Sequence, residues 1–182
     1  MKLEQHAPKL AIPVGETDHA QGPADAPLTL VEYGDYECPY CGKAYPVVKE
    51  IQKRMGDRLR FVFRNFPLNT IHEHAGVAAQ AAEAAAAQGK FWEMHDILYE
   101  HQDDLADRDL REYALKVGLE IYRFDADLSG EKYAKRVRDD FRGGVRSGVN
   151  GTPTFFINGV RYNGEPTPGA MLAALEAAGK PA

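Results

Sequence analysis

Cysteine is scarce in this chain, and so are long apolar runs. The 182 residues include two cysteines, so a disulfide within the chain must join these two. No apolar run approaches the ~18 residues that a membrane-spanning helix needs. The 22 lysines and arginines are outnumbered by 27 aspartates and glutamates, and this net charge of −5 argues against a nucleic-acid groove or a polybasic membrane patch. The length suits one domain, or one domain with a sizeable insertion.

Metal-binding patterns are also missing. A structural zinc site needs four ligands, commonly from a second CxxC pair or a downstream HxxxH, and the chain has neither. His72 and His74, about thirty residues beyond the cysteines, are therefore interpreted as surface residues at the start of a helix. We expect no metal ion, and without a Gly-rich phosphate loop we expect no nucleotide or flavin cofactor.

Both cysteines lie in one tetrapeptide, Cys38-Pro39-Tyr40-Cys41. A disulfide between them closes a loop too short to constrain the unfolded chain much, so it adds little stability. The pattern instead indicates a redox-active dithiol, in which one thiolate attacks a disulfide and the second thiol releases the product.

The region around the tetrapeptide predicts a parallel β-α-β unit. Residues 28–33 are β-branched and aromatic, which is typical of a buried strand. Residues 39–55 predict a helix with a kink at Pro46, and residues 59–63 predict the second strand. Upstream, residues 10–14 are expected to add a short edge strand, where proline is tolerated.

The rest of the chain changes from helical to β pattern. Four helices are predicted in the middle, at residues 75–88, 91–101, 110–117 and 131–146. A hairpin with a type I′ turn at Asn158-Gly159 follows, and then a last helix over residues 167–178, capped by Thr167. The order is therefore β-α-β, a helical insertion, and β-β-α, which predicts an α/β fold with a central mixed sheet.

The position of the two cysteines on the predicted helix assigns their roles. Cys38 lies at the helix start, where unpaired N–H groups and the helix dipole favour a thiolate, so it should attack and should be exposed. Cys41 lies one turn further in and should resolve the product. Asp35 and Glu37 are acidic and adjacent, so we expect them to oppose the lowered pKa of Cys38 and to give a moderately oxidising site.

Several segments resemble the DsbA family, whose thioredoxin fold carries an inserted helical domain. They are residues 31–41, 66–68, 90–95 and 151–155, and the match covers about residues 24–180. The resemblance implies four parts: an N-terminal extension at 1–24, a first thioredoxin-like part at 25–70, an inserted helical domain at 71–146 and a second thioredoxin-like part at 147–182.

The resemblance also implies roles for single residues. Pro153 is expected to be cis and to lie against Cys38, leaving the Thr152 backbone free to pair with a substrate strand. Glu32 falls where the family keeps a buried acid, which takes the proton from Cys41. Pro39 and Tyr40 are expected to border the substrate, and Tyr40 to tune the potential of the pair. The alternatives are an exposed Glu32 on the strand and an ordinary trans Pro153.

These observations predict a thiol–disulfide oxidoreductase that exchanges disulfides with cysteine-containing protein substrates, through a mixed disulfide at Cys38. A separate redox partner would recycle the Cys38–Cys41 pair, and no nucleic acid or stable membrane association is expected. Two alternatives stay open: a glutathione-binding enzyme similar to kappa-class transferases and isomerases, and a non-catalytic peptide-binding chaperone on the same fold. No signal peptide is recognised, so the chain as it stands is expected in the cytoplasm, or outside it if a leader has been removed.

Overall fold

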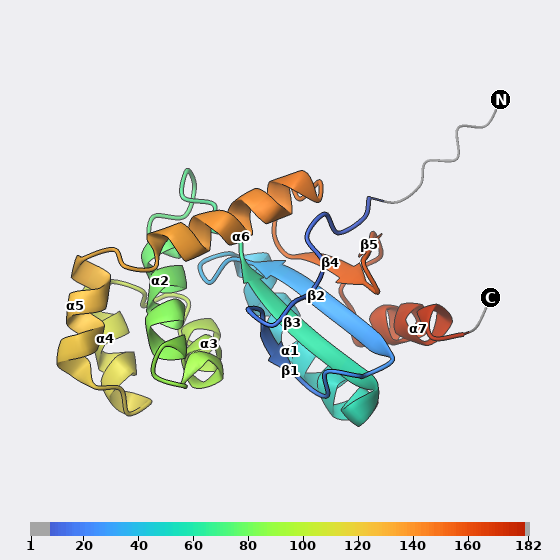
Figure 1. Cartoon of the computed structure of the whole chain (residues 1–182), viewed down its shortest axis with the longest axis horizontal. Helices are drawn as coiled ribbons and strands as arrows, with labels where there is room; N and C mark the ends of the chain where they lie inside the picture. The colour runs from blue at the N-terminus through green and yellow to red at the C-terminus, as the bar shows by residue number, and fades with distance from the viewer. Residues whose placement is uncertain (1–7, 181–182) are drawn as a thin grey trace.

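The computed structural model describes residues 8–180, and they are built around a five-stranded mixed sheet. The strand order is β1-β3-β2-β4-β5, in which β2 and β3 are parallel and the other neighbours antiparallel. The strands are β1 (His19–Gln21), β2 (Leu28–Gly34), β3 (Leu59–Asn65), β4 (Thr154–Ile157) and β5 (Val160–Tyr162). The predicted α/β fold with a central mixed sheet is therefore confirmed (Figure 1).

Alternation along the central strands supplies two apolar faces. In β2, Leu30 packs with the core under α1 (Pro39–Met55), while its neighbour Val31 packs with Phe156 on the opposite face. Successive side chains of a strand point to opposite faces, so Glu32 shares the face of Leu30. This places an acidic residue between the sheet and the helix that carries the cysteines. A second helix, α7 (Pro168–Ala178), packs beside α1.

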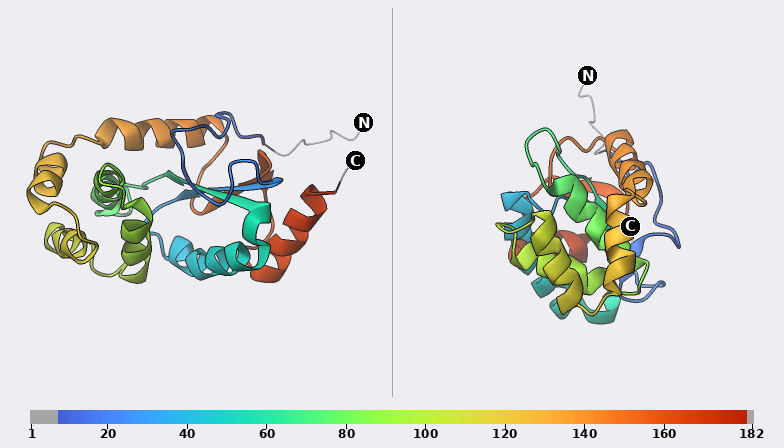
Figure 2. Two further views of the ribbon diagram at one scale, coloured as in Figure 1. Left: turned by 60° about the horizontal axis from the view of Figure 1, so that its bottom comes forward. Right: turned by 90° about the vertical axis from the view of Figure 1, so that its left-hand side faces the viewer.

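Helices between β3 and β4 form the inserted block. They are α2 (Ala75–Ala86), α3 (Phe91–Glu100), α4 (Asp107–Lys116), α5 (Ile121–Ser129) and α6 (Ala134–Arg146). Helices α2 to α5 cluster at one end of the molecule, and α6 returns along the sheet (Figures 1 and 2). The sequence predicted four of the five and missed α5. Its first turn is capped by Glu120, whose carboxylate accepts the N–H groups of Tyr122 and Arg123. Glutamate is not among the common N-cap residues, so the start signal was weak.

The predicted edge strand over residues 10–14 is wrong. The edges of the sheet are β1 and β5, and the segment meets the β4–β5 hairpin only at its start, where Leu10 donates its backbone N–H to Gly159 at 2.8 Å. The backbone carbonyls of Ile12 and Pro13 instead accept hydrogen bonds from the Arg64 guanidinium, at 2.9 and 3.1 Å. Arg64 is also bound by Asp18 at 2.8 Å. Because the buried Arg64 binds these carbonyls, they do not form the backbone hydrogen bonds of a strand.

The inserted helices are joined to the sheet by a buried polar cluster. Asn65, at the end of β3, donates its side-chain N–H to Glu83 on α2 at 2.7 Å and to Asp140 on α6 at 3.2 Å. His19 lies 3.0 Å from Glu83, and Arg136 lies 3.6 Å from Asp140. Two carboxylates of the helical block thus share one amide of the sheet. The predicted division of the chain at residues 24, 70 and 146 stays a prediction.

Candidate active site

Cys38 occupies the N-cap position of α1. Its backbone is extended, with φ −74° and ψ 121°, and Pro39 takes the first helical position, where a missing N–H costs nothing. The Cys38 N–H donates to the Asp35 carbonyl at 3.2 Å, and the Cys38 carbonyl accepts from Gly42 at 3.1 Å. The backbone N–H groups of Tyr40 and Cys41, in the first helical turn, interact with the sulfur of Cys38, as the sequence predicted.

Gln102, just beyond α3, holds the loop before this helix, and sequence reasoning missed it. Its side-chain N–H group donates to the carbonyls of Tyr36 at 2.8 Å and Cys38 at 2.9 Å. Gly42 makes room for it, because a Cβ at position 42 would overlap the Gln102 amide. A contact across 64 residues leaves no local sequence signal.

The Thr152–Pro153 loop lies against the sulfur of Cys38. In its protonated form the Cys38 thiol donates to the Thr152 carbonyl, with the two atoms 3.3 Å apart, and the Thr152–Pro153 peptide bond is cis. The hydrogen bond from Cys41 is the main cause that lowers the pKa of Cys38, to about 5, although burial opposes it. The backbone N–H groups of Tyr40 and Cys41 contribute to the same shift.

Cys41 shows the opposite behaviour. Its side chain is completely buried, and burial raises the pKa of its thiol well above the ordinary value. Its hydrogen bond to Cys38 and the charge of Glu32 raise it further. At neutral pH the pair therefore holds one thiolate, on Cys38, and one thiol, on Cys41.

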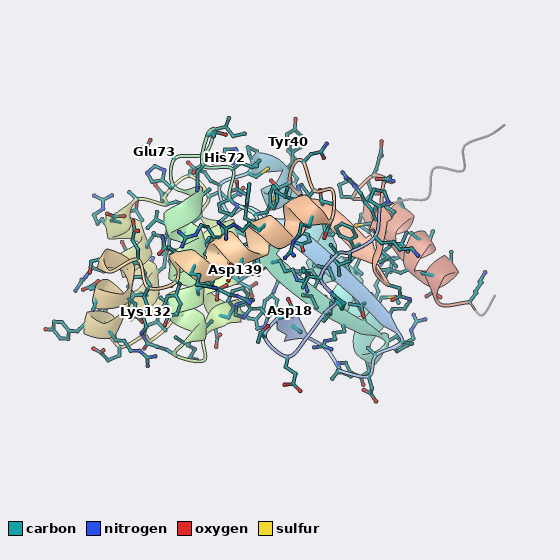
Figure 3. All side chains as sticks on the ribbon, turned by 45° about the horizontal axis from the view of Figure 1, so that its top comes forward. Asp18, Tyr40, His72, Glu73, Lys132 and Asp139 are labelled. Atoms are coloured by element: carbon teal, nitrogen blue, oxygen red, sulfur yellow. The ribbon has the colours of Figure 1, made fainter. Side chains whose placement is uncertain are left out.

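The expectation of an exposed Cys38 is wrong, because the residue is buried. Only 3% of the residue is accessible to solvent. Thr152 covers the sulfur, and the Cys41 thiol donates a hydrogen bond to it. Gln102 donates a hydrogen bond to the Cys38 carbonyl. Cys38 is covered by the Thr152–Pro153 loop and also belongs to the main cluster of buried core side chains. Tyr40, in contrast, is 69% exposed and extends from the surface next to the dithiol (Figure 3).

Glu32 is buried beneath the pair, so the alternative of an exposed strand residue is wrong. Only 2% of it is accessible, and its Oε1 has no hydrogen-bond partner among the described residues. Burial first, and then the charge of Cys38, raises the pKa of Glu32 to about 8. A carboxyl group with this pKa exchanges protons near neutral pH, which a proton acceptor for Cys41 requires.

Two histidines bind the acidic residues before Cys38, and this corrects their interpretation as simple surface residues. His72 Nδ1 lies 2.7 Å from Asp35, and His74 Nδ1 lies 3.2 Å from Glu37. Burial lowers the pKa of His72, but the hydrogen bond to Asp35 and the charges of Asp35, Cys38 and Glu37 raise it more, so the net shift is upward. Asp35 and Glu37 are thus not free to oppose the Cys38 thiolate as expected. Figure 3 shows His72 and Tyr40 along the same edge of the molecule.

An aromatic cluster supports the other side of the motif. The Tyr36 hydroxyl lies 3.0 Å from His95 Nδ1, and rings of Phe63 and Tyr99 pack around both. Burial lowers the pKa of His95 well below its usual value, so His95 is neutral. His95 is therefore an uncharged packing residue whose ring nitrogen is paired with the Tyr36 hydroxyl.

Neither a metal cluster nor a membrane-crossing helix is found among residues 8–180. No group of three or more histidine, cysteine, aspartate or glutamate side chains there is arranged to hold a metal ion. No helix in the same range is long and apolar enough to span a bilayer.

Solved structures share this architecture over nearly the whole chain. A thioredoxin-like oxidoreductase from Silicibacter pomeroyi DSS-3 is 26% identical, with a TM-score of 0.82, and the match covers 92% of this chain and 95% of that one. BdbD from Bacillus subtilis is 24% identical, with a TM-score of 0.81 and 97% of each chain covered. Wolbachia pipientis alpha-DsbA1 is 19% identical, with a TM-score of 0.79 and coverage of 93% and 94%.

Curated relatives match in sequence over a small part of their own length. The Na(+)/H(+) antiporter NhaA 1 of Salinispora arenicola is 47% identical over 170 residues, which is 93% of this chain and 26% of the antiporter. The protein of the same name from Mycobacterium sp. strain KMS is 48% identical over 89% of this chain and 27% of its own length. The chain thus spans about a quarter of these relatives.

The family model described as thioredoxin matches residues 15–177, which include the dithiol, Glu32 and the cis-proline loop. With this match and the structural neighbours above, the chain belongs to the thioredoxin family and has the fold of the DsbA-like thiol–disulfide oxidoreductases.

Proposed function

We propose that this protein exchanges disulfides with cysteines of other proteins through the Cys38–Cys41 pair. The observation that carries the proposal is the opposite displacement of the two thiol pKa values, with Cys38 lowered to about 5 and Cys41 raised, beside the Thr152–Pro153 loop. An anionic first sulfur and a protonated second one are the starting state that dithiol exchange requires.

In the reducing direction, the Cys38 thiolate attacks one sulfur of a substrate disulfide. A new S–S bond forms between Cys38 and the substrate, the substrate S–S bond breaks, and the second substrate sulfur leaves as a thiolate. The hydrogen bond from Cys41 and the first-turn amides that stabilise the Cys38 anion also stabilise it as a leaving group in the reverse, oxidising direction.

Resolution of the mixed disulfide requires the Cys41 thiol to lose its proton. Glu32 supports this step, since it is buried on the face of β2 that packs against α1 and has a pKa raised to about 8. The Cys41 thiolate attacks the Cys38 sulfur, the Cys38–Cys41 disulfide forms, and the substrate leaves as a thiolate that takes a proton. A separate redox partner then restores the dithiol. Within this chain, Cys38, Cys41 and Glu32 carry out these steps, and the proposal includes no cofactor.

Substrate recognition is assigned to the backbone of the loop that covers Cys38. Thr152 carries a carbonyl against the sulfur, and an extended substrate segment would pair with the backbone at this position. Pro39 and Tyr40 are exposed beside it and would border the same segment. Backbone pairing of this kind selects extended chain with little demand on its sequence.

The experiment follows disulfide exchange with a reduced unfolded protein and with a peptide disulfide, in the wild type and in two variants. Cys38→Ala should abolish both reactions, whereas Cys41→Ser should accumulate a mixed disulfide with the substrate. Exchange at the wild-type rate in Cys38→Ala contradicts the proposal. Glutathione transfer to an electrophile that survives in Cys41→Ala would favour the transferase alternative, and client protection unchanged by Cys38→Ser/Cys41→Ser, with no exchange in the wild type, would favour the chaperone.

A further inference from the structure

An apolar groove lies between α6, α2 and the loop that follows β3. Its cavity of about 570 Å³ is in the size range of small-ligand pockets. Pro67 and Leu68 form one wall, and Val137 and Phe141 of α6 form the other. We name this cavity the α6 groove. It is separate from the cluster of Glu83 and Asp140, which lies between the insertion and the sheet.

The rim of the α6 groove is positively charged. Arg138 and Arg142 line it, are one helical turn apart and are exposed. Neither takes part in an ion pair within the described part of the chain, and no acidic side chain lines the groove. The nearby acid of α6, Asp139, feels the charges of both arginines, but it is bound by Lys135 and lines a different cavity with Asp18. Figure 3 shows Asp139 on the side of α6 toward Asp18, with His72 and Glu73 on the other side.

One buried acceptor in the groove has no partner. Gln80 of α2 lines the cavity, and its Oε1 is buried without a hydrogen-bond donor among residues 8–180. Buried polar atoms are normally bonded, because leaving one unpaired is costly. A peptide N–H that enters the groove would supply the missing donor. At the end of the same loop, Ile71 is 71% exposed, which extends the apolar surface outward.

The wall of the groove is continuous with the active-site turn. Leu68 donates its backbone N–H to Asp35 at 2.8 Å, and His72 of the same loop bonds Asp35 at 2.7 Å. Asp35 lies three residues before Cys38 and accepts the Glu37 N–H at 2.8 Å. A chain attached to Cys38 through a disulfide therefore has this loop, and the groove behind it, next to its flanking residues.

We propose that the α6 groove binds an extended segment of the client protein that carries an apolar side chain next to an acidic one. This inference rests on the proposed function for the identity of the occupant. The apolar side chain fills the space between Leu68 and Phe141, the carboxylate pairs with Arg138 or Arg142, and a backbone N–H donates to Gln80. The dithiol itself reacts with any accessible cysteine of a client. The groove adds a preference for clients that carry such a segment near the cysteine.

The test uses two cysteine-free decapeptides with blocked ends, one with two Asp-Leu pairs and one with two Lys-Leu pairs. Amide NMR titration of the reduced protein should show shifts in residues 67–74 and in α6, with the Asp-Leu peptide bound about tenfold more tightly. Arg138→Glu/Arg142→Glu should reverse this order, because the exposed rim of the groove then carries negative charge, which attracts the Lys-Leu peptide and repels the Asp-Leu peptide. Arg146→Glu, a matched change one turn further along α6, should leave the order unchanged.

A second variant separates the polar contact from the charges. Gln80→Met keeps the length of the side chain and removes the acceptor, so it should weaken both peptides by a similar factor. Equal affinity of the wild type for the two peptides, or an unchanged order in Arg138→Glu/Arg142→Glu, overturns the proposal. Dimerisation of the wild type that this double variant abolishes would also overturn it, because the occupant would be a second copy of the chain.

Peptide binding and disulfide exchange fail independently in this design. Exchange with glutathione at Cys38 should be the same in the wild type and in Arg138→Glu/Arg142→Glu. If the wild type shows no exchange but binds the Asp-Leu peptide, the proposed function is wrong and the occupant is not a disulfide client. If exchange is present and neither peptide binds, the groove assignment alone is wrong.

Discussion

Asp35 accepts a hydrogen bond from His72 at 2.7 Å and is almost completely buried, three residues before the reactive cysteine. The same carboxylate accepts the N–H groups of Glu37 and Leu68, so it ties the active-site turn to the loop after β3. His72 and the Cys38 thiolate stabilise each other by opposite charge. The acidic residues near Cys38 are thus compensated by histidines that lie more than thirty residues away.

Replacing His72 by asparagine should raise the pKa of Cys38. The variant loses a positive charge near the thiolate and leaves the charge of Asp35 uncompensated, and interactions between partly solvated charges of this kind correspond to roughly half a pKa unit. Titration of the thiolate absorbance in His72→Asn and in the wild type measures the change. His74→Asn is the control, because its pair with Glu37 is longer and more exposed, and an equal effect of both variants would contradict the role of His72.

The His72–Asp35 pair should also make stability depend on pH. The pKa of His72 is raised above its ordinary value of 6.5, so the folded state binds its proton more tightly than the unfolded state does. The stabilisation is complete below that value and is lost as the pH rises through the raised pKa. Urea denaturation at pH 5.5 and pH 8.5 should therefore show a larger deficit of His72→Asn at the lower pH. A deficit that grows with pH would be against the account.

Replacing Glu32 by glutamine should slow the resolution of mixed disulfides by about 100-fold, within the range of general base contributions. In the wild type the resolution rate should rise with pH and level off near the Glu32 pKa of about 8, and this inflection should be absent in Glu32→Gln. Stopped-flow mixing of a preformed mixed disulfide, followed by acid quenching, measures both. Thr29→Gln, a change at a half-buried position near the start of the same strand, should leave the profile unchanged. An inflection that persists in Glu32→Gln assigns the proton transfer to another group.

Asp140 should destabilise the fold as the pH rises. Burial raises the pKa of its carboxyl from an ordinary 3.8 to about 6, so the folded state favours the protonated form. The stability that this protonation contributes is lost as the pH rises from 3.8 to about 6. Asp140→Asn removes the titration and should gain about 1–3 kcal/mol relative to the wild type between pH 4 and pH 7. Asp139→Asn, its exposed neighbour, should show no such gain. A constant difference across the range contradicts this origin.

Local pattern was enough to predict most of the fold. The strands at Leu28–Gly34 and Leu59–Asn65 are bounded by clear turn residues, and α1 begins at a proline after a cysteine. The hairpin followed from Asn158-Gly159, whose φ angles of 46° and 79° are those of a type I′ turn. Each of these signals lies within a few residues of the structure that it specifies.

Apart from helix α5, whose start signal was weak, the errors involve long-range contacts. The segment at residues 10–14 has strand composition, but Arg64, which lies more than fifty residues away, binds its carbonyls. The pairing of His72 with Asp35 and the hydrogen bonds from Gln102 likewise join residues that one sequence cannot bring together. The small exposure of Cys38 has the same cause, since Thr152 that covers it is 114 residues downstream.

The most direct test of the central claim is the titration of the Cys38 thiolate in the fully reduced protein, followed by ultraviolet absorbance, with Cys41→Ser to assign the signal. The account predicts an ionisation near pH 5 that Cys38→Ser removes, because the Cys41 thiol and the amides of the first helical turn stabilise the anion. In Cys41→Ser the serine hydroxyl can still donate, so the pKa should stay well below that of a free thiol. An ionisation at or above about 8.5, the value of an unperturbed cysteine, would contradict the account.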